Sequence, residues 1–361
     1  MKQRAPRLKD IAEEANVSLA AVSRILRGVK INEFSEETQK RVHKIAVELG
    51  WRPNLLVQGL QTGKTNTIGV FAAPFDVYWT GVLYGIHDKL LAAKRVPIVL
   101  WPNALVHPTV NRQADESTAG SSIRIGHSSI STGAGTADRL EHERLVRLID
   151  RRVDAIITWP LFDQQAIDCM TQIGERGWPI VSIDDQLPGV SNATMVTTDE
   201  SAAMRLAVDH LTEQGHRRIA FAGLDRLQAW CVRREAAFKA CVPDGLVCHV
   251  ETVGSAERPR IVELLRDNPD VTAVIASSDH LALQIIEAGR SLGRAVPADL
   301  AVIGYGNEVF DTSLLPLTSI DQQAYQIGQL AAKCALDFDV TAGSVVEVTP
   351  TLVARASTVS A

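Results

Sequence analysis

The stretch LKDIAEEANVSLAAVSRILRG, residues 8 to 28, decides the fold of the amino-terminal part of the chain. Its apolar residues recur at helical spacing, which is broken once, at Asn16. Asparagine tolerates the left-handed backbone conformation better than most residues, and Ser18 can cap a second helix by accepting a hydrogen bond from a free backbone NH. The pattern therefore predicts two short helices joined by a tight turn. It fits either a helix-turn-helix unit, whose second helix lies in the DNA major groove, or an ordinary helical hairpin.

A third helix is predicted directly after this pair. Ser35 can cap it, Glu36 and Glu37 suit its first turn because the helix dipole favours anions there, and Gly50 follows its end. Its apolar face comprises Val42, Ile45, Ala46 and Leu49. Three small helices can close one small core, so residues 1–52 are expected to form an all-α headpiece.

The next segment, 53–66, has the composition of a hinge and linker. Pro53 can begin a short helix, but Gly59 weakens that helix, and the Gly, Lys, Thr and Asn residues that follow are typical of linkers. Residues 54–61 are therefore expected to form a marginal helix that folds only on a partner.

From Ile68 onward, short apolar runs alternate with amphipathic helical patterns, which predicts an α/β body over 67–361. The runs include IGVFAAP, PIVLWP, DAIITWP, PIVSID, RIAFAGL, AVIASSD and DLAVIGYG. Such near-continuous apolar strands indicate parallel sheets covered on both faces, and ligands of such sheets bind beyond the carboxyl ends of the strands. Residues 103–136, rich in Ser, Thr, Gly and Ala, lack periodicity and are expected to be a flexible surface insertion.

The charge is divided unevenly along the chain. The formal net charge is -5, but residues 1–64 hold twelve Lys and Arg against seven Asp and Glu, and the remainder holds 25 against 35. A basic head on an acidic body is the distribution expected when phosphate neutralisation supplies non-specific affinity for nucleic acid.

Cysteine usage and the terminal sequence favour a cytoplasmic protein with no membrane segment. The five cysteines, at 169, 231, 241, 248 and 334, include no C-x-x-C pair, so reduced thiols are expected rather than disulfides or zinc ligands. No export signal or bilayer-spanning run is evident. No P-loop, G-x-S-x-G, zinc spacing or dinucleotide turn appears either, so neither an enzyme nor a metal or cofactor site is expected.

Over nearly its full length the chain resembles the lactose-repressor (LacI/GalR) family of bacterial transcription regulators. The headpiece stretch followed by WRPNLLVQGL resembles the family's head and hinge. RRVDAIITWP, EQGHRRIAFAG, RREAAF, VTAVIASSD, VPADLAVIGYGN, PLTSIDQ and PTLVARAST resemble later family segments in the right order. The resemblance implies an all-α helix-turn-helix headpiece plus an α/β two-lobed body of the periplasmic-binding-protein-like type I fold. It implies an N-lobe over about 67–196 and 323–349, and a C-lobe over about 197–322 and 350–361, with three strand crossovers.

The resemblance also implies which residues contact DNA. Leu19 and Ala20 match the pair that reads base edges from the start of the recognition helix, and their apolar side chains suit a thymine methyl. Arg24 lies one turn further along and suits either a guanine or a phosphate. The short polar side chains of Ser18, Ser23 and Asn54 suit phosphates.

In the hinge, Leu60 matches the leucine that family members wedge into the minor groove at the operator centre. Val57 and Gln58 replace the usual small and basic residues before it, so the neighbouring groove contacts differ from the family pattern. Packing of Leu56 and Leu60 against a twofold mate is compatible with the wedge.

For the body, the resemblance implies a small effector between the lobes. Arg234 matches the family arginine that holds the effector, and its planar fork can donate to two adjacent oxygens. The other candidates follow strands, stand at a crossover, or offer an indole face to a sugar ring: Asp184, Ser278, Asp279, Gln322, Trp79 and Trp230. For the two tryptophans, core packing fits equally well.

Two departures from the family bear on the effector. The frequent GFDD or GYDD strand end is here Gly304-Tyr305-Gly306-Asn307, without the usual carboxylate at Gly306, and the usual Asn-Asp pair is Ser278-Asp279. Asp, Gln, Arg and Trp together favour a carbohydrate, with a phosphorylated sugar or a purine-like ligand as alternatives.

The leading hypothesis is a homodimeric, ligand-controlled repressor that binds a near-palindromic double-stranded DNA operator, since a twofold dimer is read by a twofold sequence. The chain ends without a Leu heptad tail, which favours a dimer over a tetramer. The competing hypothesis is a solute-binding receptor, which the body alone would support and the basic head opposes.

Overall fold

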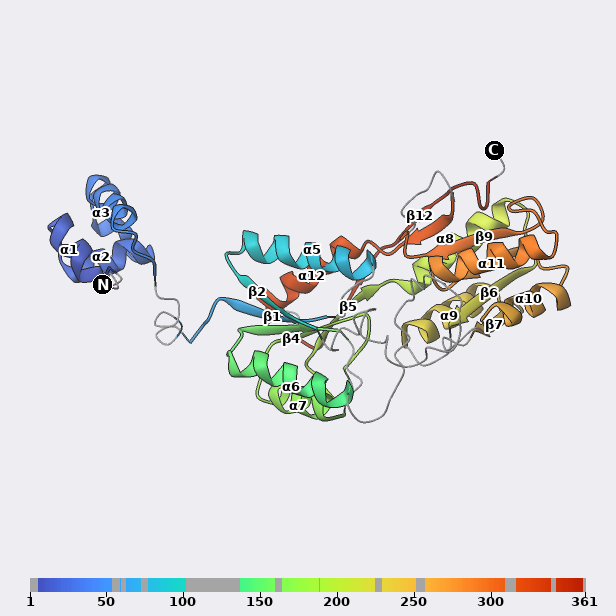
Figure 1. Cartoon of the computed structure of the whole chain (residues 1–361), viewed down its shortest axis with the longest axis horizontal. Coiled ribbons are helices and arrows are strands. Elements are labelled where there is room, and N and C mark those ends of the chain that lie inside the picture. The colour runs from blue at the N-terminus through green and yellow to red at the C-terminus, as the bar shows by residue number, and fades with distance from the viewer. Residues whose placement is uncertain are drawn as a thin grey trace, which may run out of the picture. The chain divides into compact units, whose positions relative to one another are not determined.

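The structure is a computed structural model that describes residues 6–53, 59, 63–72, 77–101, 137–159, 164–187, 189–224, 229–250, 257–308, 316–338 and 342–359. These residues divide between two compact units, 1–65 and 66–361 (Figure 1). The predicted insertion at 103–136 lies outside the described residues. No helix among the described residues is long and apolar enough to cross a membrane.

The first unit contains the three predicted helices. They are α1 (Leu8–Ala15), α2 (Leu19–Arg27) and α3 (Glu36–Glu48), with a 3₁₀ turn, η1 (Ile31–Glu33), before α3. Asn16 ends α1 in the left-handed conformation, with φ of 52°, and the Ser18 hydroxyl accepts a hydrogen bond from the Ala21 NH at 3.1 Å. Both turn predictions are therefore confirmed, because the sharp reversal needs a residue that accepts positive φ and α2 needs a cap.

The core of the headpiece consists of the apolar faces that the helical spacing predicts. Its buried members are Ile11, Ala12, Ala15, Val22, Ile25, Val42, Ile45 and Ala46. Leu8, Val17, Leu26, Phe34, Leu49 and Trp51 pack around them. The predicted cap of α3 is also confirmed, since Ser35 accepts from the Thr38 NH.

The second unit contains two six-stranded sheets. The first has the order β11-β5-β4-β3-β1-β2, with every neighbouring pair parallel. Its strands are β1 (Thr67–Phe71), β2 (Val96–Leu100), β3 (Ala155–Thr158), β4 (Ile180–Ile183), β5 (Thr194–Thr198) and β11 (Val345–Val348). One face is covered by α5 (Val77–Ala92) and α12 (Ala324–Leu336), and the other by α6 (Ala137–Asp150) and α7 (Gln164–Glu175) (Figure 1).

The second sheet has the order β12-β10-β9-β8-β6-β7 and is parallel except for β12, which runs antiparallel to β10. Its strands are β6 (Ile219–Leu224), β7 (Leu246–Val250), β8 (Ala273–Ala276), β9 (Ala301–Tyr305), β10 (Thr318–Asp321) and β12 (Thr351–Val353). Its faces carry α8 (Glu200–Glu213) with α9 (Ala229–Cys241), and α10 (Glu257–Asp267) with α11 (Asp279–Ser291).

The chain passes between the two sheets three times, after β5, after β10 and after β11, as the resemblance implies. We call the layers around the first sheet the N-lobe and those around the second the C-lobe. The prediction of parallel sheets covered on both faces is confirmed, with β12 as the one antiparallel strand among the described residues.

Helices α5 and α12 approach each other closely because each contributes a glycine at the contact. A Cβ added at Gly85 would lie 2.0 Å from the Tyr325 carbonyl oxygen, and one at Gly328 would lie 2.0 Å from the Val82 carbonyl oxygen. No side chain larger than hydrogen fits at either position without separating the helices.

Candidate functional site

The start of α2 exposes the residues that are expected to read DNA. Helix α2 buries Ala21, Val22 and Ile25 against the headpiece core, so its opposite face is left to solvent. Leu19 is 53% exposed although it is apolar, and Ser18 and Ala20 are exposed beside it. Ser23 is half-buried. An exposed leucine at a capped helix start is free to contact a partner surface.

Arg24 lies on the same face but is engaged within the headpiece. Its Nη1 donates to Glu33 Oε2 at 2.9 Å, and Lys30 approaches the same carboxylate at 3.7 Å. Both side chains of the Arg24–Glu33 pair are 49% exposed, so the pair contributes little free energy. Arg24 can therefore exchange this partner for a base or a phosphate. The hinge residues Asn54, Val57 and Leu60 lie outside the described residues.

In the body, the sequence-predicted residue with the most extensive contacts is Arg234 of α9, which is buried. Its Nε donates to Glu200 Oε1 at 3.1 Å, its Nη1 to the Ser277 carbonyl at 2.7 Å, and its Nη2 to Gln322 Oε1 at 2.8 Å. These partners come from the start of α8, the end of β8 and the crossover after β10. Arg234 thus joins three segments that the topology brings to the carboxyl edge of the second sheet.

Two aromatic rings enclose this guanidinium. The Arg234 Cζ atom lies 3.6 Å from the Tyr305 ring centroid and 4.5 Å from the Trp230 ring centroid. The Tyr305 hydroxyl also donates to Glu200 Oε2 at 2.5 Å. A buried cation is held here by a carboxylate and by the faces of two rings, which is the arrangement that offsets its desolvation. We call Glu200, Trp230, Arg234, Tyr305 and Gln322 the Arg234 cluster.

The electrostatics of the cluster follow from burial and pairing. Burial acts most strongly on Arg234 and lowers its pKa, but the nearby groups, Glu200 foremost and then Tyr305, Cys231 and Asp184, together outweigh burial and raise that pKa above its ordinary value. Burial, reinforced by the charge of Glu200, raises the pKa of Tyr305 well above its usual range. Arg234 therefore stays charged and Tyr305 stays neutral near neutral pH.

Asp184 stands at the carboxyl end of β4 in the N-lobe, in the left-handed conformation with φ of 68°. Its two carboxylate oxygens accept from the Tyr78 hydroxyl at 2.9 and 2.8 Å. Burial raises the pKa of Asp184 to about 7, although the bond from Tyr78 and the charge of Arg234 act in the opposite direction. Asp185 instead accepts from Arg233 at 2.5 Å. The two successive carboxylates point to different partners, as expected for neighbours in the chain.

Ser278 and Asp279 support the carboxyl edge of the second sheet. The Ser278 hydroxyl caps α11 by accepting from the Leu281 NH at 3.2 Å. Asp279 accepts from the Ser319 hydroxyl at 2.5 Å and from the Glu308 NH at 2.6 Å, and burial raises its pKa. These bonds connect the start of α11 to β10 and to the segment after β9, so the side chains of both residues stabilise the C-lobe.

Trp79 lies in the core of the N-lobe, only 3% exposed, between Tyr78 and Trp159. The structure therefore assigns it to packing, whereas Trp230 contacts the predicted effector arginine. Four residues around Asp184 and Arg234 were absent from the sequence-based set: Tyr78, Glu200, Arg233 and Tyr305. Glu200 and Tyr305 each stand at or just after a strand end, so the position rule for parallel sheets could have indicated them.

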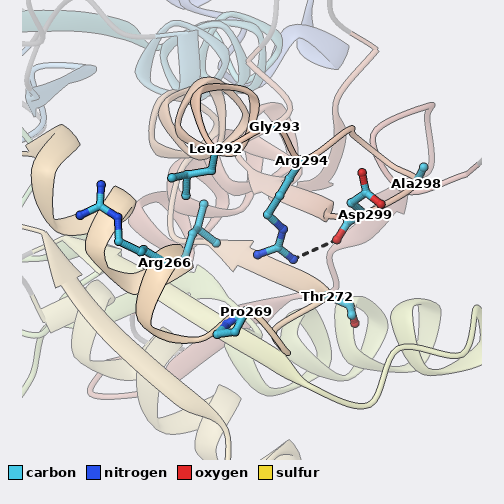
Figure 2. A pocket seen from close by; sticks show the side chains of 9 residues that line it. Arg266, Pro269, Thr272, Leu292, Gly293, Arg294, Ala298 and Asp299 are labelled. Atoms are coloured by element: carbon cyan, nitrogen blue, oxygen red, sulfur yellow. Dashed lines mark hydrogen bonds between the residues drawn. The ribbon is translucent and has the colours of Figure 1, made fainter.

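Among the described residues, no group of three His, Cys, Asp or Glu side chains could hold a metal ion. A separate cavity of about 660 Å³ lies at the amino edge of the second sheet, lined by residues that include Arg266, Thr272, Arg294 and Asp299 (Figure 2). Arg294 there donates to the carbonyls of Val271 and Asp299 and so braces the loop before β9. This cavity is at the opposite strand ends from the Arg234 cluster.

Residues 7–54 match the sequence profile of bacterial regulatory proteins of the lacI family, and residues 208–358 match that of a periplasmic binding protein-like domain. The chain belongs to the LacI family of bacterial regulatory proteins. This LacI-family chain is 29% identical to the HTH-type transcriptional regulator CelR of Thermobifida fusca, covering 93% of this chain and 92% of that protein. It is 28% identical to the regulator GalS of Salmonella typhimurium, covering 92% of each.

Solved structures show the same LacI-family fold. A lac repressor dimer bound to operator and the anti-inducer ONPF aligns with a TM-score of 0.73 and 21% identity, covering 99% of this chain and 100% of that one. A CelR–cellobiose complex aligns with a TM-score of 0.60 and 24% identity, covering 98% and 99%. The relatives are named as transcriptional regulators rather than enzymes. This LacI-family chain is accordingly a DNA-binding transcriptional regulator.

Proposed function

We propose that this regulator is a homodimeric repressor whose affinity for a near-palindromic operator is controlled by a carbohydrate bound between its lobes. The observation that carries the proposal is the Arg234 cluster, a set of fixed polar groups and an indole at the carboxyl edge of the second sheet, in a chain that also has a helix-turn-helix head. The presence of a candidate effector site and a DNA-binding head in one chain supports control of DNA binding by the effector.

The head supports operator binding by residues of two kinds. Leu19 and Ala20 would contact thymine methyls, and Arg24 would leave Glu33 to bond a guanine or a phosphate. Ser18, Ser23 and Asn54 would position the head on phosphates, and Leu60, with Val57 beside it, would wedge into the minor groove at the operator centre. With few polar base readers, much of the specificity would come from the shape of the DNA and the central kink.

A hydroxyl-rich ring fits the side chains between the lobes. Asp184 and Gln322 offer hydrogen-bond acceptors, Arg234 offers donors, and the face of Trp230 suits the apolar face of a sugar. That a structurally similar regulator forms a complex with cellobiose supports a sugar as the ligand class. In this proposal the two lobes act as one effector-binding and dimerisation domain, and the hinge and linker 53–66 connects them to the headpiece 1–52. The N-lobe comprises about 67–196 and 323–349, and the C-lobe comprises about 197–322 and 350–361.

The coupling would be a population shift between two lobe arrangements, limited by the difference in the ligand's affinity for them. The arrangement would set the separation of the two hinge segments in the dimer and hence whether they fold on DNA. Action on an operator places the protein in the bacterial cytoplasm, and the site would bind its ligand without chemical conversion.

The test is operator selection followed by titration. Full-length protein is used to select duplexes from a random pool, and binding of the selected duplex is measured by fluorescence anisotropy with and without each of a set of sugars, including cellobiose. A selected palindrome whose affinity changes at least fivefold with one sugar supports the proposal. Selection of no preferred duplex, or an affinity that no sugar changes, would refute it.

A further inference from the structure

Arg233, the neighbour of the effector-site arginine, connects the two lobes. It belongs to α9 of the C-lobe, yet its guanidinium bonds to the N-lobe. Nη1 donates to Asp185 Oδ1 at 2.5 Å, and Nη2 donates to the Asp184 carbonyl and, at 3.4 Å, to Thr197 Oγ1. One side chain therefore contacts the segment after β4 and also β5.

The two ends of this link belong to different cores. Helix α9 is held in the C-lobe by Ala237 and Phe238, which pack with β6 and α8. Asp184 and Asp185 directly follow β4, whose Val181 and Ile183 belong to the N-lobe core. The Arg233 bonds are thus formed only when the lobes lie in this orientation, and a rotation of one lobe against the other breaks them.

Helix geometry explains why two successive arginines have opposite roles. Neighbours on a helix point about 100° apart, so Arg234 enters the C-lobe cluster while Arg233 reaches across to the other lobe. The pair is largely shielded, because the side chain of Arg233 is 32% exposed and that of Asp185 is 12% exposed. A shielded charge-assisted hydrogen bond, here from Nη1 to one Asp185 oxygen, is stronger and more directional than a surface ion pair.

One nitrogen of the Arg233 guanidinium forms no hydrogen bond to the described residues. Arg233 Nε is buried and has no hydrogen-bond partner among the described residues. A buried donor without a partner carries a desolvation penalty, so this link is weaker than a fully satisfied one. That is the property required of a contact that must open and close.

The link also determines which groups face each other between the lobes. With Arg233 bound to the segment 184–185, Asp184 of the N-lobe lies close enough to Arg234 and Glu200 of the C-lobe for their charges to act on it. The link therefore holds candidate ligand groups from both lobes near each other, which reduces the ordering cost of binding.

We infer that Arg233 and Asp185 form an inter-lobe latch that holds the body in the arrangement competent to bind ligand. Opening the latch shifts the population toward arrangements in which the two halves of the effector site are separated. Arg233 is a positioning residue in this role. The link to operator control rests on the proposed function, whereas the latch itself does not.

The test is hydrogen exchange on the full-length, ligand-free protein, followed by mass spectrometry. Arg233→Gln should raise exchange several-fold in peptides covering 184–187 and 229–234. Asp185→Asn should raise it by a smaller factor, because Arg233 keeps its bonds to the Asp184 carbonyl and to Thr197. The double variant should match Arg233→Gln, because the bond to Asp185 is already lost in that variant. Arg218→Gln is the matched control, since Arg218 pairs with Asp270 at 2.7 Å within the C-lobe alone. The double variant that exchanges the two residues, Arg233→Asp with Asp185→Arg, should restore part of the protection from hydrogen exchange that Arg233→Gln loses.

Unchanged exchange in both single variants would overturn the latch, as would independent, additive effects. If Arg233→Gln does not fold, Asp185→Asn, which keeps the size of the side chain, decides the question. In calorimetric titration with cellobiose, Arg233→Gln should bind about tenfold more weakly than the wild type; equal or tighter binding would overturn the positioning role. If the wild type binds neither cellobiose nor any selected operator, the proposed function fails, while the exchange data still decide the latch.

Discussion

Replacing Asp184 by Asn should remove a pH dependence of stability that the fold imposes on this chain. Burial raises the pKa of Asp184 to about 7, whereas an unfolded aspartate titrates near ~3.9. The folded state therefore binds the proton more tightly than the unfolded chain does. The contribution of this residue to stability is fully present below pH ~3.9 and is lost as the pH rises through about 7.

The magnitude follows from the separation of the two pKa values. About three pH units at about 1.4 kcal/mol each correspond to about 4 kcal/mol. Asp184 is partly exposed to solvent, so screening reduces this value, and we expect a loss of about 2 to 3 kcal/mol between pH 4 and pH 8. The charges that face the carboxylate are those of Arg233, Arg234 and Glu200, and the Tyr78 hydroxyl is bonded to it.

Asparagine suits the position in every other respect. It accepts the left-handed conformation that Asp184 adopts, and its amide oxygen can still accept the bond from Tyr78. Asp184→Asn should therefore leave stability near pH 4 little changed and raise it at pH 8 by about 2 to 3 kcal/mol relative to the wild type.

The measurement is urea denaturation of wild type and variant at half-unit steps from pH 4 to pH 8.5, followed by tryptophan fluorescence. Asp267→Asn, at an exposed position at the end of α10, controls for the loss of one negative charge. Parallel stability curves for wild type and Asp184→Asn across this range would refute the assignment of a buried, partly protonated carboxylate.

Three further outcomes are expected. Arg24→Ala should reduce the affinity for the selected operator by about 1 to 3 kcal/mol while leaving weak, salt-sensitive binding to random duplex, as measured by anisotropy; a retained sequence preference would remove Arg24 from base readout. Arg234→Ala should keep operator binding but lose the sugar response, and an unaltered response would exclude Arg234 from the effector site. The buried Glu200 loses its partner in this variant at a cost of about 3 to 5 kcal/mol, so a thermal melt is used to show that the sample is folded. Gly328→Ala should destabilise the body by more than ~3 kcal/mol in the same melts, because its Cβ would lie 2.0 Å from the Val82 carbonyl oxygen, and a wild-type midpoint would contradict this packing.

Local chemistry was enough to predict the headpiece. The turn at Asn16, the caps Ser18 and Ser35, and the apolar faces of all three helices depend on residues within four positions of each other. The alternating β and α units of the body were equally apparent, since parallel strands that are buried on both faces must be apolar throughout. Some elements were not singled out, among them β5 and α9, because Thr-rich or charged segments carry a weak apolar pattern and owe their conformation to their neighbours.

The effector region could be predicted in part. Arg234, Asp184 and Gln322 were found from their positions at strand ends and crossovers and from the resemblance. Trp230 lies four residues before Arg234 on α9, so helical spacing could have indicated that contact. Nothing nearby along the chain indicates the ring of Tyr305 or the carboxylate 34 residues away.

The sequence by itself determined the kind of protein, a basic helix-turn-helix head followed by a two-sheet α/β body, because periodicity, capping and charge balance are properties of short segments. Only the tertiary structure decided how each candidate is used. It buries Trp79 in a core, makes Ser278 a helix cap, raises the pKa of Asp184 to about 7, and directs Arg233 and Arg234 to different lobes. The physical reason is that burial and pairing depend on segments that are distant in sequence and meet only when both sheets have formed.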